Sequence, residues 1–324
     1  MRTIILISYS FLFIACSNND ESGSILSDPP YISITDSIRQ TPQNADLYYH
    51  RAILLHQNNQ TALAEEDIRK AWNLQPKEEY ALSLTTLLKQ KNTDSAIVFL
   101  KEAVQKLPNS IALQIGLARG YQNKKQPAIA LQITDAIIQQ YPGQLDALTL
   151  KSEILASQND KKGALTWLEK AYALVPSDPS LAYDLAFEYA DAKNAKALTL
   201  ADSILNAKGP EPEKAWYIKG VYFANSGKGK EAVKNFDEAI RINYNFMDAY
   251  RDKGSMLLDQ KNYKEALQTF QLALKIAPAS AEFYYLSAKA QEGLGNKADA
   301  KLNYQRAYGL DQSMTEAKAA ADKL

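Results

Sequence analysis

The chain has 324 residues, of which 37 are basic and 37 acidic, so its formal net charge at neutral pH is zero. A balanced chain without a basic block lacks the positive surface that binds nucleic acid, and we therefore expect no nucleic-acid partner. The single cysteine, Cys16, excludes an intramolecular disulfide and a cysteine-based metal cluster.

The first element in chain order is an apolar run from Ile4 to Ala15, which follows Arg2. About 12 helical residues reach only about 18 Å, whereas the hydrocarbon core of a bilayer is about 30 Å thick. A basic residue, a short apolar run and a small residue at its end are typical of a secretion signal. We therefore predict that residues 1–15 are a signal peptide and not a buried core helix.

The residues Leu12-Phe13-Ile14-Ala15-Cys16 resemble the lipoprotein box of bacteria, although Phe13 replaces the usual aliphatic residue. The resemblance implies that residues 1–15 are a lipoprotein signal peptide and that Cys16 is lipidated and becomes the mature N-terminus. Ser17 stands where an aspartate would retain such a protein in the inner membrane. The resemblance thus implies a lipid anchor at the bacterial outer membrane, on its periplasmic or its cell-surface face.

The segment after the cysteine is polar, contains glycine and serine, and ends in Pro29-Pro30. This composition is typical of a flexible linker, and fourteen such residues span on the order of 20 Å. We therefore predict that residues 16–30 are a lipidated tether that keeps the folded part close to the membrane.

Prolines and alanines then recur with a period of about 34 residues. Prolines on this period are Pro42, Pro76, Pro108, Pro142, Pro176, Pro210 and Pro278. Alanines on it are Ala64, Ala96, Ala130, Ala164, Ala232, Ala266 and Ala300. A fixed period of this length predicts repeated supersecondary units that stack on one another.

The unit at 213–246 shows the repeated pattern most completely. Its positions 4, 8, 11, 15, 20, 24 and 27 hold Trp216, Gly220, Phe223, Gly227, Ala232, Phe236 and Ala239. This pattern resembles the tetratricopeptide repeat, a helix–turn–helix unit, and implies an all-α fold, an α-solenoid wound as a right-handed superhelix. Small residues at positions 8, 20 and 27 let helices approach to about 8–10 Å, while large residues fill the space around them. One unit cannot bury its apolar face alone, so the units must stack.

We predict about eight repeats between two capping helices. The predicted parts are an N-terminal capping helix at 31–44, repeats one to five at 45–212, repeats six to eight at 213–312, and a C-terminal capping helix at 313–324. The residues Ser313 to Glu316 match a capping box that would open the last helix. The segment Gly209-Pro210-Glu211-Pro212 is either a break between two groups of repeats or a long turn.

Two repeats depart from the pattern. The repeat at about 77–110 is two residues short, because Pro108 follows Pro76 by 32 residues, and this deficit blurs the pattern of its first helix. In the repeat at 179–212, a one-residue slip brings Ala197, Ala201 and Ile204 to the expected apolar positions. The slip predicts a shortened turn between the two helices of that repeat.

Motifs of catalysis and metal binding are missing from the sequence. His50 and His56 are six residues apart and do not share a helix face as a metal pair would. The chain has no His-Glu-x-x-His, no glycine-rich phosphate loop and no Gly-x-Ser-x-Gly. Since the repeats leave no room for a catalytic domain, we predict that the protein is not an enzyme and has no metal site and no cofactor.

The resemblance implies that the first helix of each repeat lines a groove, chiefly through unit positions 2, 5, 9 and 12. The residues predicted to bind a partner there are Tyr49, Ile53, Arg119, Tyr183, Phe187, Tyr217, Val221, Arg251 and Tyr285. Tyrosine recurs at position 5, and its large ring with a hydrogen-bonding tip is typical of binding hot spots. The alternative is that these rings pack between neighbouring first helices. No aligned unit has the lysine and asparagine of a carboxylate clamp.

Two functions are compatible with these features. The first is a membrane-anchored scaffold or assembly factor that binds a partner protein or peptide in the groove. The alternative is a surface lipoprotein that binds a glycan or another small ligand in the same groove.

Overall fold

The computed structural model describes residues 25–207 and 211–324. These residues form α-helices, and no β-strand occurs among them, which confirms the all-α solenoid of repeats. Cys16 and the predicted signal peptide lie outside the described residues, as does Pro210. The structure divides into two compact units, residues 25–133 and 134–324, with the boundary inside one helix.

The helices follow one another in pairs along the chain. Those of the first unit are α2 (Ile32–Gln40), α3 (Ala45–Gln57), α4 (Thr61–Leu74), α5 (Glu78–Lys91), α6 (Thr93–Lys106), α7 (Ile111–Asn123) and the beginning of α8 (Pro127–Gln140). Those of the second unit are α9 (Leu145–Ser157), α10 (Lys161–Leu174), α11 (Pro179–Asp191), α12 (Lys196–Asn206), α13 (Pro212–Asn225), α14 (Gly229–Ile242), α15 (Met247–Asp259), α16 (Tyr263–Ile276), α17 (Ala281–Gly293), α18 (Lys297–Leu310) and α19 (Thr315–Lys323).

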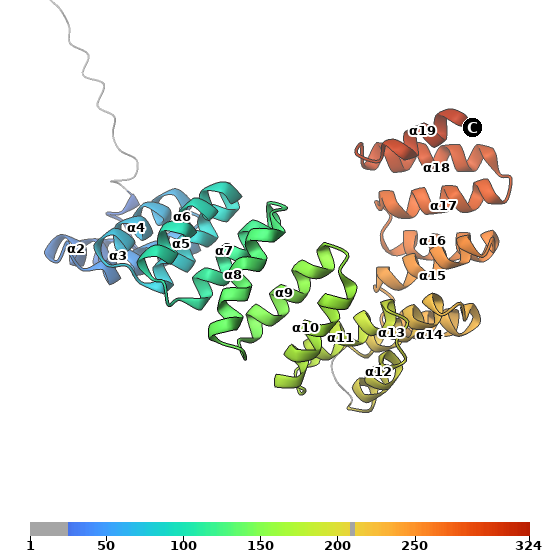
Figure 1. Ribbon diagram of the computed structural model, residues 1–324. Coiled ribbons are helices and arrows are strands. Elements are labelled where there is room, and N and C mark those ends of the chain that lie inside the picture. Colours follow the sequence, from blue (N-terminus) through green and yellow to red (C-terminus); the bar gives the residue numbers. More distant parts are fainter. Residues whose placement is uncertain (1–24, 208–210) are drawn as a thin grey trace, which may run out of the picture. The chain divides into compact units, whose positions relative to one another are not determined.

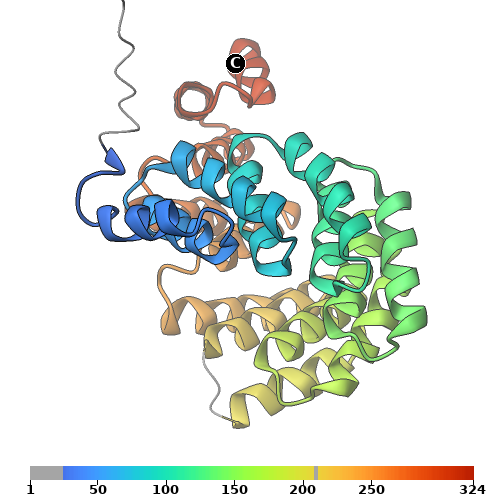
Figure 2. The ribbon, with the colours of Figure 1, turned by 90° about the vertical axis from the view of Figure 1, so that its left-hand side faces the viewer.

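In the first unit each helix packs against its neighbours in the chain, as the blue to cyan ribbons of Figure 2 show. A buried polar network joins α2 to this stack. Arg51 on α3 donates two hydrogen bonds to Asp67 on α4, at 2.6 and 2.7 Å, and one to the Thr35 hydroxyl on α2, at 3.1 Å. All three residues are buried. The network therefore fixes the N-terminal helix to the first repeat.

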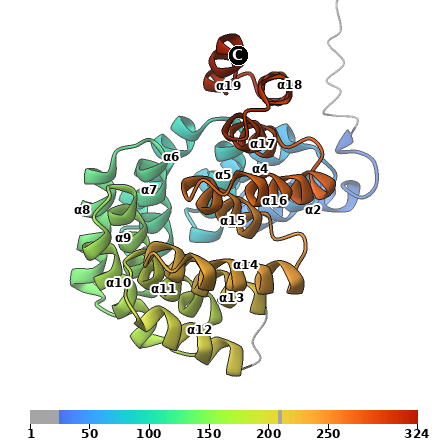
Figure 3. The same cartoon turned by 90° about the vertical axis from the view of Figure 1, so that its right-hand side faces the viewer.

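In the second unit the pairs α13–α14, α15–α16 and α17–α18 lie one upon the next, and α19 packs on α18 (Figures 1 and 3). A lysine at unit position 7 joins successive repeats. Lys219 pairs with Asp202 and Lys253 with Asp237, each at 2.7 Å, and Lys151 pairs with Asp135 in the same way. In each pair the aspartate lies on the second helix of the preceding repeat.

The small residues of the repeat permit the close approach of its helices. A Cβ atom at Gly220 would lie 2.6 Å from the ring of Phe236, and one at Gly254 would lie 2.1 Å from the ring of Phe270. Such distances are far below van der Waals contact, so only glycine fits between these helices. The alanines at unit positions 20 and 27, such as Ala232, are buried throughout.

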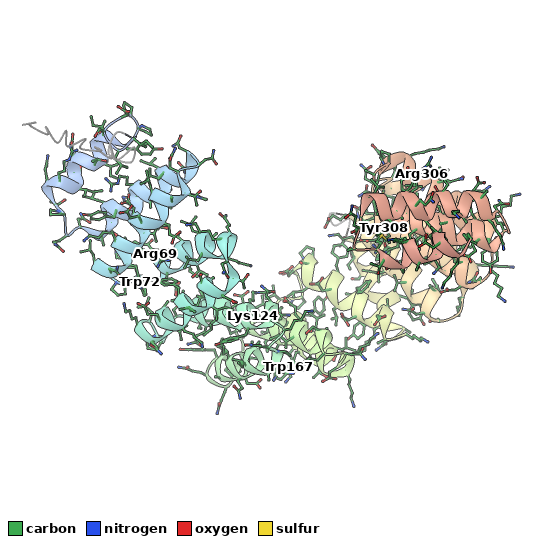
Figure 4. All side chains as sticks on the ribbon, turned by 90° about the horizontal axis from the view of Figure 1, so that it is seen from above. Arg69, Trp72, Lys124, Trp167, Arg306 and Tyr308 are labelled. Atoms are coloured by element: carbon green, nitrogen blue, oxygen red, sulfur yellow. The ribbon has the colours of Figure 1, made fainter. Side chains whose placement is uncertain are left out.

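The tryptophans of two second helices pack within their own units (Figure 4). Trp72 on α4 is buried and meets the ring of Phe99 edge-on, with 5.4 Å between centroids. Trp167 on α10 is half-buried, and the ammonium of Lys151 lies 3.9 Å from its ring centroid. Arg306 and Tyr308, also labelled in Figure 4, lie on α18 at the other end of the second unit.

Most turns between paired helices share one backbone motif. Residues with positive φ at unit position 15 are Asn59, Lys125, Asn159, Lys193, Gly227, Lys261 and Gly295. The amide that follows each of them donates to a carbonyl five residues earlier, as Gln60 does to Leu55 at 2.8 Å. This is the hydrogen bond of a Schellman motif, which satisfies a carbonyl at the end of the first helix.

The short repeat at about 77–110 keeps a complete first helix, and the turn between its two helices is reduced to a single residue. α5 extends over 14 residues and ends at Lys91, and α6 begins at Thr93. Asn92 alone joins them, and its side chain accepts a hydrogen bond from the Asp94 amide at 2.7 Å. A capping side chain thus replaces the left-handed turn residue of the other repeats.

The slipped register of the repeat at 179–212 is confirmed. Ala197 and Ala201 are fully buried and Ile204 is nearly so. The Ala197 amide donates to the Asn194 carbonyl three residues back, whereas the equivalent Ala64 amide reaches four residues back to Gln60. This shorter hydrogen-bonded turn at the start of α12 therefore accommodates the missing residue.

The apolar core continues across the proline-rich segment before α13. Ala201 and Ile204 on α12 share one buried cluster with Ala215 and Ile218 on α13. α13 packs against both α11 and α12. The repeats on either side of residues 208–210 are therefore in contact.

The capping box predicted for the C-terminal helix does not form. α19 extends from Thr315 to Lys323, its N-cap is Met314, and no side chain caps it. The Ser313 hydroxyl donates instead to the Asp311 carboxylate at 2.7 Å. Asp311 also accepts from the Ser313 amide, and these bonds hold the pKa of its carboxyl below the ordinary value. Ser313 is therefore hydrogen-bonded within the turn before α19 and does not cap that helix.

Candidate functional site

A groove of about 470 Å³ lies on the first helices of the second unit. Its walls come from α11, from α13 and from the start of α15. The lining residues are Asp178, Pro179, Ser180, Tyr183, Asp184, Phe187, Glu211, Lys214, Tyr217, Ile218, Phe246 and Asp248. Three of the predicted binding residues, Tyr183, Phe187 and Tyr217, meet here.

Tyr217 stands at the centre of an aromatic cluster in this groove. Its ring is stacked with that of Phe187 at 6.2 Å between centroids and meets Phe246 edge-on at 5.1 Å. Its hydroxyl donates to the Asp252 carboxylate on α15. Burial, together with this hydrogen bond to a carboxylate, raises the pKa of Tyr217 well above its ordinary value. The ring therefore stays neutral and ties α13 to both neighbouring first helices.

Tyr183 also has a structural part in the groove. It is 7% exposed, and its hydroxyl donates to the Glu211 carbonyl at 3.0 Å, just before α13. Burial raises the pKa of Tyr183, and the nearby Glu211 carboxylate adds to the effect. Phe187, by contrast, is 38% exposed. Phe187 is thus the ring of this cluster that a ligand can reach most easily.

The polar rim of the groove is predominantly acidic. Among the lining residues four are carboxylates and one, Lys214, is a cation. Asp184 forms no ion pair among the described residues, and loss of hydration followed by repulsion from Glu153 raises the pKa of its carboxyl. Glu188, one turn further along α11, has its pKa raised by loss of hydration and then by Asp191. The groove therefore favours a cationic ligand over an anionic one.

The other predicted residues of the second unit lie beyond this groove. Val221 lines a neighbouring depression of about 280 Å³ together with Asp252. Arg251 is bound to the carboxylates of Asp248 and Asp252. Tyr285 is half-buried, with its ring 5.5 Å from that of Tyr304.

The predicted residues of the first unit are described separately. The Tyr49 hydroxyl shares a 3.0 Å hydrogen bond with the Ser83 hydroxyl on α5, and its ring lies 4.8 Å from that of Tyr80. Ile53 is half-buried and Arg119 is exposed. Three of the position-5 tyrosines, Tyr49, Tyr183 and Tyr217, therefore bond to residues at or beside the next first helix, which is the packing alternative considered from the sequence.

The predicted binding residues do not include Asp184, Lys214 or Phe246. A signal for the acidic rim was present, because α11 from Pro179 to Asp191 contains three acidic residues and no basic one. The zero net charge of the whole chain hides this local imbalance.

The described residues contain neither a metal-binding cluster nor a membrane-spanning helix. No group of three or more His, Cys, Asp and Glu side chains among them could hold a metal ion. Likewise, none of the helices within 25–207 and 211–324 combines the length and the apolar character needed to cross a bilayer.

Comparison with known families agrees with the repeat pattern. Family models of the tetratricopeptide repeat match residues 34–66, 87–154, 219–281 and 281–314. The chain belongs to the tetratricopeptide repeat family. Repeats of this family commonly form protein-interaction scaffolds, and the chain shares their fold.

Relatives with known names share parts of this repeat array. Human Superkiller complex protein 3 is 28% identical over 149 residues, which is 45% of this chain and 10% of that protein. Human Tetratricopeptide repeat protein 13 is 28% identical over 171 residues, 50% of this chain and 19% of that protein. The chain therefore spans only a tenth to a fifth of the length of these relatives.

Solved structures show the same fold. A tetratricopeptide repeat protein from Parabacteroides merdae is 17% identical with a TM-score of 0.60, covering 75% of this chain and 97% of its own. PilW, a type IV pilus biogenesis factor, is 17% identical with a TM-score of 0.52, covering 64% of this chain and 95% of its own. At this identity the similarity concerns the fold alone.

Proposed function

We propose that this tetratricopeptide repeat protein is a membrane-anchored scaffold that holds a partner protein or peptide in the groove of its second unit. The observation that carries the proposal is the exposed Phe187 ring, backed by the Tyr217 cluster in a groove of about 470 Å³. A rigid aromatic surface surrounded by polar side chains is typical of binding hot spots.

The test is capture of the partner by the Phe187→Ala variant. We expect affinity to fall by about 1–2 kcal/mol, or roughly 5- to 30-fold, because the anchoring ring is lost. Tyr183 and Tyr217 are less suitable targets, since both also hold neighbouring helices together. Tyr141→Ala is a matched control, because Tyr141 is 39% exposed and lies outside the groove. Equal capture by wild type and a correctly folded Phe187→Ala protein would exclude the groove.

We propose further that a lipid at Cys16 attaches the protein to the bacterial outer membrane. The support is the apolar run that ends in Ala15 directly before this cysteine. Two or more acyl chains hold a protein firmly to a bilayer, whereas one binds reversibly. The Cys16→Ser variant should move from the membrane fraction to the soluble fraction. An unchanged membrane fraction would contradict the anchor, and labelling of intact cells would distinguish the surface from the periplasm.

A small ligand such as a glycan is the second candidate for the same groove. Its volume of about 470 Å³ lies within the range of about 300–1,000 Å³ that is usual for small-molecule sites. Saturable heat on titration of glycans into the purified protein, lost in Phe187→Ala, would favour this candidate over a peptide.

A further inference from the structure

α11 has the most one-sided charge of the first helices in the second unit. Of its acidic residues, Asp191 pairs with Lys161, whereas Asp184 and Glu188 form no ion pair among the described residues. Residues three and four positions apart share one face of a helix. Asp184 therefore lies on the same face of α11 as the exposed ring of Phe187, and both line the groove. Glu188 lies one turn beyond Asp184, outside the groove lining.

The groove already accommodates one cation that the chain itself supplies. The Lys214 ammonium lies 2.7 Å from the Glu211 carboxylate and 5.6 Å from the centroid of the Tyr183 ring. A carboxylate and an aromatic face are the two partners that stabilise a partly dehydrated ammonium. This arrangement shows which ligand chemistry the walls of the groove suit.

Phe187 lies one turn beyond Tyr183 on α11 and offers the same combination of ring and carboxylate. Here no lysine or arginine of the described chain is bound to either carboxylate. The charged groups that act on Asp184 and Glu188 are Glu153, Asp178 and Asp191, which repel them, and Lys161 and Lys214, which attract them. Asp184 and Glu188 are therefore repelled by neighbouring carboxylates, and a cationic ligand bound beside them would reduce this repulsion.

We propose that the partner inserts a basic segment into this groove, with a lysine or arginine side chain over Phe187 and beside Asp184. Apolar neighbours in that segment would contact Tyr217 and Phe246. The inference rests on the proposed scaffold function and specifies the chemistry of the partner. An acidic segment would instead meet four carboxylates in the groove lining and one lysine.

The test is selection from a library of random peptides displayed on phage, with the full chain as the target. We expect selected peptides to be enriched in lysine and arginine next to apolar residues. Synthetic copies should bind at least about tenfold more weakly to the Asp184→Asn/Glu188→Gln variant, and more weakly at high salt. The matched control is Asp299→Asn/Asp322→Asn, which removes the same charge from exposed positions outside the groove and should bind as wild type does.

The possible results separate the inference from the function on which it rests. Neutral or acidic peptides that lose affinity in Phe187→Ala but not in Asp184→Asn/Glu188→Gln would overturn the basic segment and leave the groove a binding site. Basic peptides that bind wild type and both double variants equally would overturn the placement over Phe187. A library that yields no peptide dependent on Phe187 would contradict both proposals.

Discussion

Two regions of this protein use charge in opposite ways. In the first unit the side chains of Arg51 and Asp67 are 9% and 8% exposed and are bound to each other. In the second unit Asp184 lies beside the exposed ring of Phe187 and Glu188 lies one turn further along α11, and neither forms an ion pair among the described residues. The first arrangement joins three helices, while the second joins none. Burial and ion pairing therefore distinguish charged side chains that the fold requires from charged side chains that a ligand can bind.

The largest expected effect is on the buried pair. Arg51→Met should destabilise the first unit by about 3–5 kcal/mol, because Asp67 would remain buried without its partner. Hydrogen exchange of the α2–α4 amides would show the loss of protection.

Two further variants sharpen this prediction. Arg51→Met/Asp67→Leu should recover most of the lost stability, since no buried charge remains unpaired. Arg39→Ala removes an exposed pair with Asp36 and should cost less than about 1 kcal/mol. A loss in Arg51→Met no larger than that in Arg39→Ala would show that the buried pair does not hold the first repeat.

An intermediate effect is expected at the recurrent lysine between repeats. The Lys253 side chain is 13% exposed and its partner Asp237 is 53% exposed. Lys253→Met should lower stability by less than about 1 kcal/mol, because the aspartate left behind is hydrated and methionine keeps the apolar stem. Urea titrations of both proteins at low and high salt would measure this difference. A loss comparable to that in Arg51→Met would contradict the explanation that an unpaired charge costs more stability when it is buried.

The smallest effect, and one of opposite sign, is expected on α11. Loss of hydration and neighbouring acids raise the pKa of Asp184 and Glu188 in the folded protein. An acid whose pKa is raised by folding destabilises the fold above that pKa and ceases to do so as the pH falls toward about 4. Asp184→Asn/Glu188→Gln should therefore gain less than about 1 kcal/mol at pH 7 and nothing near pH 4. Thermal unfolding at both pH values would check this, and a loss of stability at pH 7 would give the carboxylates a structural role.

The periodic part of the structure was predictable from the sequence. Gly220, Ala232 and Phe236 occupy fixed unit positions because helix packing leaves one shape of side chain for each place. The same reasoning located the slip at Ala197, since a buried small residue had to be restored. Because every repeat packs in the same way, the contacts between helices appear in the sequence as a short pattern of residue types that recurs in each repeat.

The groove was only partly predictable. Tyr183 and Phe187 are both aromatic residues at groove positions, yet the first is 7% exposed and the second 38%. The Tyr183 hydroxyl donates to the carbonyl of Glu211, which stands outside the repeated pattern, and the ring packs in a buried cluster. Likewise, Asn92 shortens a turn by a capping bond that the period does not encode. Residues outside the repeated pattern therefore influence which side chains at the groove positions are exposed to a ligand.

The left-handed residue at the centre of the inter-helix turns has a consequence for how this chain can change. Lysine occupies that backbone conformation at Lys125, Lys193 and Lys261, whereas Gly227 and Gly295 adopt it without steric cost. A lysine held there is less favourable than glycine by roughly 1 kcal/mol. Replacing one of these lysines with glycine should therefore stabilise the protein. Such substitutions lie outside the groove and could offset the stability lost through mutations that alter the binding surface.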